Sequence, residues 1–419
     1  MEKIFQMKNF FQMENFFQEL MKSLKISNDE FQVIDSKFYK RLSRGGDLSL
    51  IIGESYMEKE WKSNNLANVF RKIMKVNYSN YNELLLPMLK QFPLETSKLI
   101  FNGIKADIEE TINCLPNMQS IELSKRVGEQ HYDIPDILYE YMLDSQRQYT
   151  CGYWKPNTKT LEDAQQNKIK LVIDKLQIPE NTEMNILDIG CGWGGLTNAI
   201  SKRYPKCKIE GISISKQQIL FANKKYASKN KNLNYYFCDY REMPNKNKKY
   251  DRIISVGMFE AIGVKNYDTF FNIIENILMN DGVFVLHTIT SHTLEKYLTG
   301  QQRVSTDKWI DTYIFPGGII PKSEDVIKSS QSQNLMYHHI QNLSVSYAKT
   351  LREWYKNFTS NWKTIKKTNP EFFTKKFYRM WEYYLLSCMV AFEEKRIQLT
   401  QFVFTKKTYI GMYIFTEKK

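Results

Sequence analysis

The spacing of apolar residues predicts a sheet of parallel strands in the second half of the chain. From about residue 184, short runs rich in β-branched residues alternate with segments of helical periodicity. The predicted strands are MNILDI, KIEGISI, NYYFC, DRIISV and GVFVLHT, and the helices between them include SKQQILFANKKYASK and YDTFFNIIENILM. This alternation is typical of an α/β protein with a doubly wound sheet, whose ligands bind at the carboxyl ends of the strands.

The N-terminal part has a less regular pattern. Residues from about 30 to 115 mix helical periodicity with short strands and include the turn-rich stretch RGGDLSLIIGESYMEKEW. The first residues contain a small repeat, FQMKNF followed by FQMENF, whose period of six spreads phenylalanines around a helix instead of along one stripe. Two interpretations stay open: an extension that is partly helical or mobile, and a segment that touches lipid.

The chain is strongly basic. Lys and Arg number 59 against 46 for Asp and Glu, which gives a formal net charge of +13. This balance favours an anionic partner, either nucleic acid or a membrane surface, and a merely solvated lysine-rich surface is the alternative. The sequence has no compact Arg/Lys cluster and no recognition-helix signature, so we expect no nucleic-acid partner.

Cysteine spacing and hydropathy indicate the cellular compartment in which the protein works. The six cysteines include no CxxC pair and no histidine partner at zinc spacing, so we expect neither a metal site nor a disulfide scaffold, as fits a reducing compartment. No run of 18 apolar residues and no signal-peptide core are present. We therefore expect a cytoplasmic protein that touches membranes only from outside.

A glycine-rich turn, LDIGCGWGGL, lies between the first predicted strand of the sheet and its helix. Glycines let the backbone turn tightly and approach a ligand closely. Gly190, Gly192 and Gly195 match GxGxxG, although a lone match is a weak signal. The second strand ends at Ser213 rather than at an acidic residue, which disfavours a nicotinamide dinucleotide. The turn, together with CDY after the third strand, instead suits S-adenosylmethionine.

Two side chains near this turn are candidates for holding that methyl donor. Asp239 could accept a hydrogen bond from the adenine amino group, and Gln218 could reach the ribose. For Gln218 an alternative stays open, because Ser215 and Gln218 also form an S-x-x-Q capping box at the start of a helix.

A carboxylate stands in an unexpected place in the stretch IISVGMFEAIG. The apolar run ends at Gly257, and Glu260 follows between Phe259 and Ala261. A buried polar group without a partner costs roughly 1–3 kcal/mol, so an acid at a strand end is a candidate for function. An ordinary loop acid is the alternative.

Ten stretches of the sequence together resemble the cyclopropane-fatty-acyl-phospholipid synthase family, which includes the mycolic acid cyclopropane synthases and depends on S-adenosylmethionine. The resemblance runs in order from about residue 36 to residue 405. The stretches that carry it are FYKRL…GGDLSLIIGESYMEKEW, HYDIPDILYEYMLDSQRQYTCGYW, LEDAQQNKIKLVIDKL, LDIGCGWGGL, CDYRE, VGMFEAIGVKNY, VLHTI, YIFPGGIIP, VSYAKTLREWY and RIQLTQFVF.

The family implies a fold and a division into domains. The expected fold is a Rossmann-like class I S-adenosylmethionine-dependent methyltransferase domain with a smaller, mainly helical N-terminal domain. The expected boundaries are 1–28 for the extension, 29–120 for the small lipid-associated domain and 121–419 for the catalytic domain. A helical insert at about 290–330 would cover an acyl channel. A homodimer is also implied, for which the sequence offers no independent support.

The activity implied is methylene transfer onto a cis double bond of an acyl chain in a membrane phospholipid, at the inner face of the membrane, with a bound bicarbonate ion as base. The residues implied for the anion are Cys151, Glu260, His287 and Tyr347, with backbone from Ile289. Those implied for the donor are Tyr149, Thr150, Gly190, Gly192, Ser213, Gln218, Asp239 and Tyr240.

Each anion-site residue has a plainer interpretation. Cys151 could be a small buried hydrophobe, His287 could be a hydrogen-bonded core histidine, and Tyr347 is one of 26 tyrosines whose assignment rests on the resemblance. Three other functions also stay open: an acyl-chain methyltransferase that makes a methyl branch, a small-molecule amine N-methyltransferase, and a lipid-binding protein without activity.

The sequence departs from the family pattern at two places. Ala261 stands where the family usually has His, and Pro135-Asp136 replaces a usual Gly-Asn. Neither change removes an anion-site residue, and both leave room for a different substrate or product.

Overall fold

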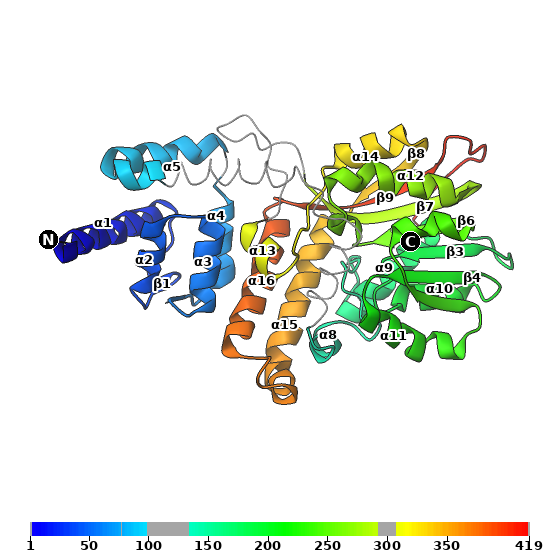
Figure 1. The fold of residues 1–419 in the computed structure, drawn as a ribbon, viewed down its shortest axis with the longest axis horizontal. Coiled ribbons are helices and arrows are strands. Elements are labelled where there is room, and N and C mark those ends of the chain that lie inside the picture. Colours follow the sequence, from blue (N-terminus) through cyan, green and yellow to red (C-terminus); the bar gives the residue numbers. More distant parts are fainter. Residues whose placement is uncertain (1, 77, 99–133, 292–306, 418–419) are drawn as a thin grey trace. The chain divides into compact units, whose positions relative to one another are not determined.

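The computed structural model describes residues 2–76, 78–98, 134–291 and 307–417 (Figure 1). Contacts divide the chain into two units. The helical unit comprises Met1–Pro116, Thr293–Pro316 and Lys366–Arg396, and the sheet unit comprises Asn117–His292, Gly317–Ile365 and Ile397–Lys419. Two segments from late in the sequence thus group with the N-terminal residues. The predicted domain boundaries are continuous in sequence and stay a prediction.

The sheet unit is built on seven strands in the order β5-β4-β3-β6-β7-β9-β8. The five neighbours from β5 to β7 are parallel, as the sequence predicts, and β9 is antiparallel to both β7 and β8. The strands are β3 (Asn185–Ile189), β4 (Lys208–Ser213), β5 (Leu233–Phe237), β6 (Tyr250–Val256), β7 (Leu278–Thr290), β8 (Leu335–Asn342) and β9 (Gln398–Lys406). The parallel α/β prediction is therefore confirmed, and β8 and β9 extend the sheet beyond it.

Helices cover both faces of this sheet. The α-helices are α8 (Ile137–Met142), α9 (Leu161–Leu176), α10 (Gly195–Arg203), α11 (Lys216–Lys225), α12 (Tyr267–Ile277), α14 (Ser323–Ser332) and α15 (Ser344–Thr368). The short 3₁₀ helices are η1 (Ala227–Lys229), η2 (Tyr240–Lys246), η3 (Phe259–Ala261) and η4 (Val264–Asn266).

Two hydrophobic clusters lie on opposite faces of the sheet, because successive strand residues point to opposite sides. Leu187 and Ile253 belong to the cluster that includes α12 and α14, whereas Ile186 and Ile254 belong to the cluster that includes α9, α10 and α11. Strands buried on both faces are continuous apolar runs, which is why the sequence revealed them.

The described residues of the helical unit form helices and a small two-stranded sheet. Its elements are α1 (Glu2–Ser23), β1 (Gln32–Val33), α2 (Lys37–Arg44), α3 (Leu48–Met57), β2 (Trp61–Lys62), α4 (Leu66–Met74), α5 (Tyr78–Gln91), α13 (Lys308–Tyr313) and α16 (Lys375–Glu393). In the N-terminal repeat, Phe16 and Phe17 are buried, with the Phe17 ring 4.7 Å from that of Phe38, and Phe11 is exposed. Part of the repeat thus packs into the helical unit, and contact with lipid stays a prediction.

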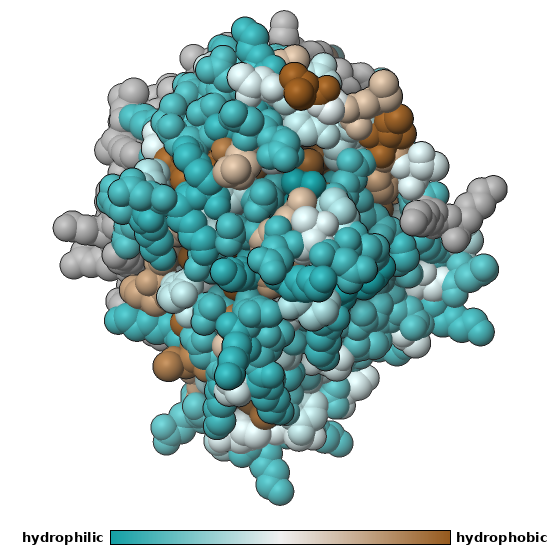
Figure 2. All heavy atoms as spheres, turned by 90° about the vertical axis from the view of Figure 1, so that its right-hand side faces the viewer, coloured by the Kyte–Doolittle hydropathy of each residue, from teal (hydrophilic) through white to brown (hydrophobic). Residues whose placement is uncertain are grey.

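The predicted insert at about 290–330 does not form one element. Residues 292–306 lie outside the described residues, α13 belongs to the helical unit, and α14 belongs to the sheet unit. No helix in the described ranges combines the length and apolarity needed to cross a bilayer. The face drawn in Figure 2 is mostly hydrophilic, with small hydrophobic groups between.

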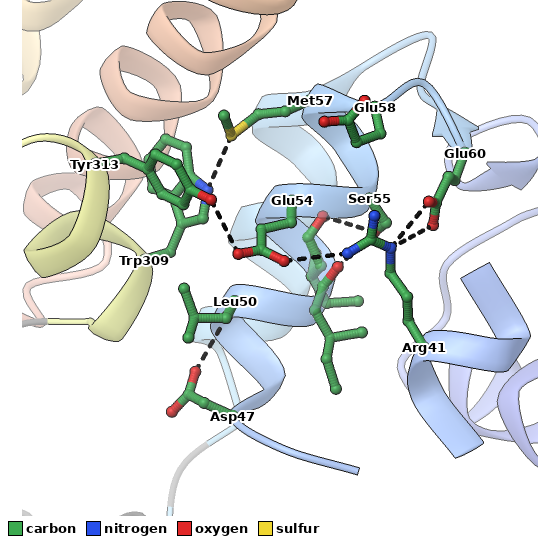
Figure 3. A network of polar contacts seen from close by, with 12 residues as sticks. Arg41, Asp47, Leu50, Glu54, Ser55, Met57, Glu58, Glu60, Trp309 and Tyr313 are labelled. Atoms are coloured by element: carbon green, nitrogen blue, oxygen red, sulfur yellow. Dashed lines mark hydrogen bonds and ion pairs between the residues drawn. The ribbon is translucent and has the colours of Figure 1, made fainter. Parts of the chain in front are cut away.

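A polar network joins α2, α3 and α13 within the helical unit (Figure 3). The Arg41 guanidinium donates to both carboxylate oxygens of Glu60, at 2.9 and 3.0 Å, and to Oε2 of Glu54 at 3.1 Å. The Tyr313 hydroxyl donates to Oε1 of Glu54 at 2.9 Å, and Trp309 Nε1 donates to the Met57 sulfur at 3.3 Å. Arg41 thus neutralises Glu60, whose side chain is only 4% exposed.

Replacing Arg41 by methionine is expected to destabilise the helical unit by about 2 kcal/mol. The change leaves the Glu60 carboxylate buried without its cation, and the estimate lies below the usual cost of breaking a buried pair because Arg41 itself is one-third exposed. Urea unfolding followed by tryptophan fluorescence measures the effect. The control is Lys37→Met, at the start of the same helix as Arg41. It breaks an exposed pair with Asp35, which precedes the helix, and should change stability by less than about 0.5 kcal/mol. Equal losses in both variants would contradict the expectation.

Candidate functional site

The glycine turn after β3 forms one wall of the candidate site. Gly190 has φ +83°, its N–H donates to the Ile212 carbonyl at 2.9 Å, and a Cβ built on it would lie 2.7 Å from the Met258 Cβ. Gly192 has φ +55°, and a Cβ there would meet nothing within 4 Å. The first glycine is therefore required for close packing, whereas the second faces open space where a ligand could approach.

The end of β4 explains both interpretations of Gln218. The Ser215 hydroxyl accepts from the Gln218 backbone N–H at 3.4 Å, which is the N-cap half of the predicted capping box. The Gln218 side chain instead accepts from the Ser213 hydroxyl at 3.1 Å, and Ser213 also accepts from the Ser215 N–H. Ser213 thus orients the Gln218 amide, and a role of these two residues toward a ligand stays a prediction.

The residues after β5 are largely engaged with one another. The Asp239 carboxylate accepts from the Arg241 backbone N–H at 2.9 Å and from the Arg241 guanidinium at 2.8 and 2.7 Å. Because an ionised carboxylate offers about four acceptor positions, Asp239 keeps capacity for one more donor. The Tyr240 ring packs against Phe270, and its hydroxyl is buried without a partner among the described residues.

The segment that carries Tyr149, Thr150 and Cys151 is fastened to α15. Thr350 Oγ1 accepts from the Gly152 N–H at 3.1 Å and from Trp154 Nε1 at 3.0 Å. Thr350 lies three residues after Tyr347, and therefore on the same face of the helix. Cys151 is buried, its thiol donates to the Gly152 carbonyl at 3.0 Å, and burial raises the pKa of this thiol.

Aromatic rings continue this connection. The Trp354 ring lies 5.2 Å from the Tyr149 ring and 6.1 Å from the Tyr347 ring. Tyr347 is half-buried, whereas Trp354 is fully buried. The structure thus connects Tyr149 and Tyr347 through one tryptophan, which the sequence analysis did not single out.

Glu260, His287 and Ile289 meet at the carboxyl ends of β6 and β7. The Ile289 backbone N–H donates to Glu260 Oε1 at 2.6 Å, while Oε2 is buried without a partner in the described part of the chain. His287 Nδ1 lies 2.9 Å from the Gln401 side-chain nitrogen, and Nε2 is likewise buried and unpartnered among described residues. Burial raises the pKa of Glu260 and lowers the pKa of His287, so both groups are favoured in neutral forms.

The loop with Cys151 lies beside this group. The Gly257 N–H donates to the His287 carbonyl at 2.8 Å, and a Cβ on Gly257 would lie 2.8 Å from the Thr150 methyl carbon. Thr150, Glu260 and His287 therefore share one edge of the sheet.

The two departures from the family pattern lie outside the buried group. Ala261 is exposed, and its N–H donates to the Met258 carbonyl at 2.9 Å. The Pro135 carbonyl accepts from the Leu138 N–H at 3.0 Å at the start of α8.

Sequence reasoning missed two buried charges next to the site. Lys168 donates to Thr150 Oγ1 at 3.1 Å and to the Gln148 side-chain oxygen, and burial lowers its pKa to about 8. Both carboxylate oxygens of Asp188 are buried with no partner among described residues, and burial raises its pKa to about 7. Helical periodicity could have revealed Lys168, because it lies on the same face of α9 as the apolar Leu161 and Val172.

Replacing Asp188 by asparagine is expected to raise the melting temperature increasingly as the pH rises from 5 to 8. Since the folded-state pKa of Asp188 lies above its unfolded value of 3.8, the folded protein binds a proton that the unfolded chain has released, and this stability is lost as the pH rises toward 7. Asparagine does not titrate. Thermal unfolding of both proteins without ligand measures the difference. Asp268→Asn, at an exposed position on α12, is the control. A difference in melting temperature between wild type and Asp188→Asn that does not vary with pH would contradict the expectation.

Comparisons with known proteins agree with this arrangement. A family profile described as mycolic acid cyclopropane synthetase matches residues 119–402. The cyclopropane-fatty-acyl-phospholipid synthase of Escherichia coli (strain K12) is 34% identical over 387 residues, which cover 92% of this chain and 90% of that protein. Cyclopropane mycolic acid synthase 1 of Mycobacterium tuberculosis is 31% identical over 281 residues, covering 66% of this chain and 95% of that protein.

Solved structures show the same fold. The cyclopropane synthase MmaA2 from Mycobacterium tuberculosis matches with a TM-score of 0.60 and 29% identity, covering 67% of this chain and 98% of that one. The mycolic acid cyclopropane synthase CmaA1, solved with SAH and CTAB, matches with a TM-score of 0.60 and 28% identity over similar shares. The predicted methyltransferase fold, with its smaller helical N-terminal part, is confirmed. The chain belongs to the mycolic acid cyclopropane synthetase family of S-adenosylmethionine-dependent methyltransferases.

Proposed function

We propose that this enzyme transfers a methylene group from S-adenosylmethionine to a cis double bond of an unsaturated phospholipid acyl chain and so forms a cyclopropane ring. The observation that carries the proposal is the pair of buried polar atoms, Glu260 Oε2 and His287 Nε2, that lack a partner among the described residues at the carboxyl edge of the sheet. Buried polar atoms are nearly always hydrogen-bonded in folded proteins, so this pair indicates a missing ligand.

The reaction explains why such a ligand is needed. An alkene needs no deprotonation before it attacks a sulfonium methyl group, so holding the two reactants in position supplies much of the catalysis. The attack gives a carbocation, which water would trap and aromatic faces stabilise. A proton must then leave the transferred methyl group so that the ring can close. A bicarbonate ion, which Glu260 and His287 would help to hold, would supply the base for this proton.

The residues at the edge of the sheet fit an anion because burial shifts each of them toward its uncharged form. Burial raises the pKa values of Glu260 and Cys151 and lowers the pKa of His287, so the uncharged carboxyl, thiol and imidazole forms are favoured at the site. In their uncharged forms the carboxyl and imidazole groups can donate a hydrogen bond to an anion without adding a negative charge beside it. The Cys151 thiol donates to the Gly152 carbonyl in this structure and would exchange that bond for one to the anion. Ile289 holds Glu260 Oε1, which leaves Oε2 to carry the acidic proton. Tyr347 is proposed as the fourth donor, from α15.

The donor site is proposed at the turn after β3, where Gly192 faces open space. Helix and strand ends around this turn present backbone and short polar side chains suited to the amino acid and nucleoside parts of S-adenosylmethionine. The residues proposed for it are Tyr149, Thr150, Gly190, Gly192, Ser213, Gln218, Asp239 and Tyr240. The SAH-bound relative CmaA1 supports a donor site in this fold.

The acyl substrate is proposed to be part of a membrane phospholipid, as the name of the Escherichia coli relative states for that protein. The net charge of +13 would draw the enzyme to anionic headgroups at the inner face of the membrane, with the 29–120 domain as the proposed lipid-associated part. A homodimer, which the family resemblance suggested, is also proposed.

Vesicle binding is expected to depend on charge and on salt. Sedimentation with vesicles should show stronger binding to anionic than to neutral phospholipid, and raising the salt from about 0.05 to about 0.5 M should weaken it, because the Debye length shrinks to a few Å. Equal binding to both vesicle types at low salt would contradict the electrostatic part of the proposal.

The function is tested by incubating the enzyme with S-adenosylmethionine and vesicles of a monounsaturated phospholipid, followed by mass analysis of the released acyl chains. A gain of one CH₂ with a ring in place of the double bond supports the proposal. A methyl-branched chain, methylation of an added amine but not of lipid, or donor binding without any product would overturn it.

A further inference from the structure

Two fully buried side chains, Lys175 and Gln401, form a series of hydrogen bonds that ends at the His287 ring. Lys175 Nζ on α9 lies 2.6 Å from the Gln401 side-chain oxygen on β9 and 2.6 Å from the Gln341 side-chain oxygen on β8. The Gln401 side-chain nitrogen lies 2.9 Å from His287 Nδ1. Lys175 and Gln401 each have 0% exposure, so water does not compete for these bonds. The proposed reaction assigns no role to either residue.

The direction of every hydrogen bond in this series follows from the groups present. A lysine ammonium only donates, so charged Lys175 donates to both glutamine oxygens, and the uncharged amine still has two N–H groups for these two bonds. The oxygen of Gln401 therefore faces the lysine, and its NH₂ group faces the imidazole. Since an amide NH₂ only donates, His287 Nδ1 must accept. A neutral imidazole that accepts at Nδ1 carries its hydrogen at Nε2.

We propose that Lys175 and Gln401 are positioning residues that fix His287 in the Nε2–H tautomer, so that it presents a hydrogen-bond donor to the anion held beside Glu260. This rests on the proposed function in one respect, namely that an anion is the group held there. The other tautomer would turn a lone pair toward the anion, which could then be held only through an O–H group of its own. The two residues, called the relay below, thus decide whether the uncharged His287 donates a hydrogen bond to the anion or accepts one from it.

The charges around the ring support a neutral imidazole. Burial lowers the pKa of His287 well below its usual value, and the nearby cations of Lys168 and Lys175 lower it further. Protonation therefore does not supply the Nε2–H, and the tautomer must. Burial also lowers the pKa of Lys175 to about 7, and the uncharged amine keeps two N–H groups, one for each glutamine oxygen.

The test reads the tautomer directly, in protein without methyl donor or lipid. The full chain, with ¹⁵N-labelled histidine, gives long-range ¹H–¹⁵N spectra in which protonated and unprotonated ring nitrogens are well separated. The chain has five histidines, and His287→Gln assigns the signals of interest. The expected result is a neutral Nε2–H ring between pH 6 and 8. A wild-type ring in the Nδ1–H form, or an imidazolium, would overturn the proposal.

Two variants and a matched control test the relay itself. Lys175→Met frees the Gln401 amide to turn, and Gln401→Leu removes it, so both should convert the single tautomer into a mixture. Gln341→Leu is the control. Gln341 is the other partner of Lys175 and pairs with Gln401 across strands β8 and β9, so its replacement should keep the wild-type spectrum. An unchanged ring in folded Lys175→Met or Gln401→Leu would overturn the relay, as would a mixture in Gln341→Leu.

Kinetics separate this inference from the proposed function. In the lipid assay, kcat for Lys175→Met and Gln401→Leu should fall about tenfold, which corresponds to about 1.4 kcal/mol and matches the loss of one hydrogen bond, while KM for the donor stays within about twofold. If the tautomer is as expected but the wild-type enzyme forms no cyclopropane, the proposed function fails and the tautomer assignment stands. If cyclopropane forms with the Nδ1–H ring, the relay alone fails.

Discussion

Replacing Glu260 by alanine is expected to lower kcat about 10³-fold while leaving the affinity for S-adenosylmethionine within about threefold. Groups that serve proton transfer typically contribute 10²–10⁴-fold to the rate. The Glu260 side chain is held by the Ile289 N–H at 2.6 Å, and its other oxygen is buried without a partner among the described residues, so its loss removes part of the proposed anion site. The donor site on the β3 turn does not include this carboxyl.

Glu260→Gln distinguishes a neutral carboxyl from a carboxylate. Burial raises the pKa of Glu260, and a protonated carboxyl donates from Oε2 as an amide NH₂ would. Glutamine should therefore retain more turnover than alanine, with kcat about tenfold below wild type. Turnover and isothermal titration with S-adenosylmethionine measure the two effects. Undiminished turnover in Glu260→Ala would contradict the role of this residue, and glutamine as inactive as alanine would contradict the neutral carboxyl.

Replacing Gly190 by alanine is expected to destabilise the sheet unit by about 4 kcal/mol. The residue has φ +83°, which costs a non-glycine residue roughly 1–2 kcal/mol, and the new methyl group would lie 2.7 Å from Met258 Cβ, where overpacking costs about 1–3 kcal/mol more. Met258 precedes η3, so its displacement should also disturb Glu260. Urea unfolding of the protein without ligand measures the loss.

Gly192→Ala is the matched control for this prediction. It has φ +55° and so carries the same backbone cost, but its methyl group would meet nothing within 4 Å. Its free energy of unfolding should fall by only about 1–2 kcal/mol. The methyl group would instead intrude where the donor is proposed to lie, so donor affinity should fall about tenfold or more, a cost of about 1.4 kcal/mol. Equal stability of the two variants, or unchanged donor affinity in Gly192→Ala, would contradict the packing described for the turn.

The parts of the fold that the sequence predicted are those with local signals. The strands β3, β4 and β6 are apolar runs because helices cover both of their faces, and β3 and β4 end in recognisable turn residues. Since ligands bind at the carboxyl ends of parallel strands, the strand pattern alone assigned Gly190 and Glu260 to one edge of the sheet. His287 followed from the resemblance and from its position near the end of an apolar strand.

Other parts depended on contacts distant in sequence. The edge strand β8 exposes Met336, Tyr337 and Ile340, so it has neither a continuous apolar run nor strict alternation. Its pairing with β9 joins residues between 58 (Asn342 and Thr400) and 71 (Leu335 and Lys406) positions apart, which no local pattern encodes. In the same way, Gln401 belongs to the site only because β9 lies beside β7.

The sequence also did not identify the buried lysines that support the candidate site. Lys168 and Lys175 lie seven residues apart on α9, at positions that the helical period assigns to the buried face. A lysine on a buried face signals a specific partner, but the partners, Thr150 and Gln401, come from other parts of the chain. Sequence alone could therefore have marked both lysines as unusual without saying what they hold.

The central claim is that a proton leaves the transferred methyl group so that a ring closes, and an isotope label tests it most directly. The enzyme is incubated with S-adenosylmethionine carrying a fully deuterated methyl group and with vesicles of a monounsaturated phospholipid, and the acyl product is analysed by mass spectrometry and NMR. We predict that the product keeps two of the three deuterons, on the methylene carbon of a cyclopropane ring. A product that keeps all three deuterons on a methyl branch, or that has two deuterons on an exocyclic double bond, would contradict the account.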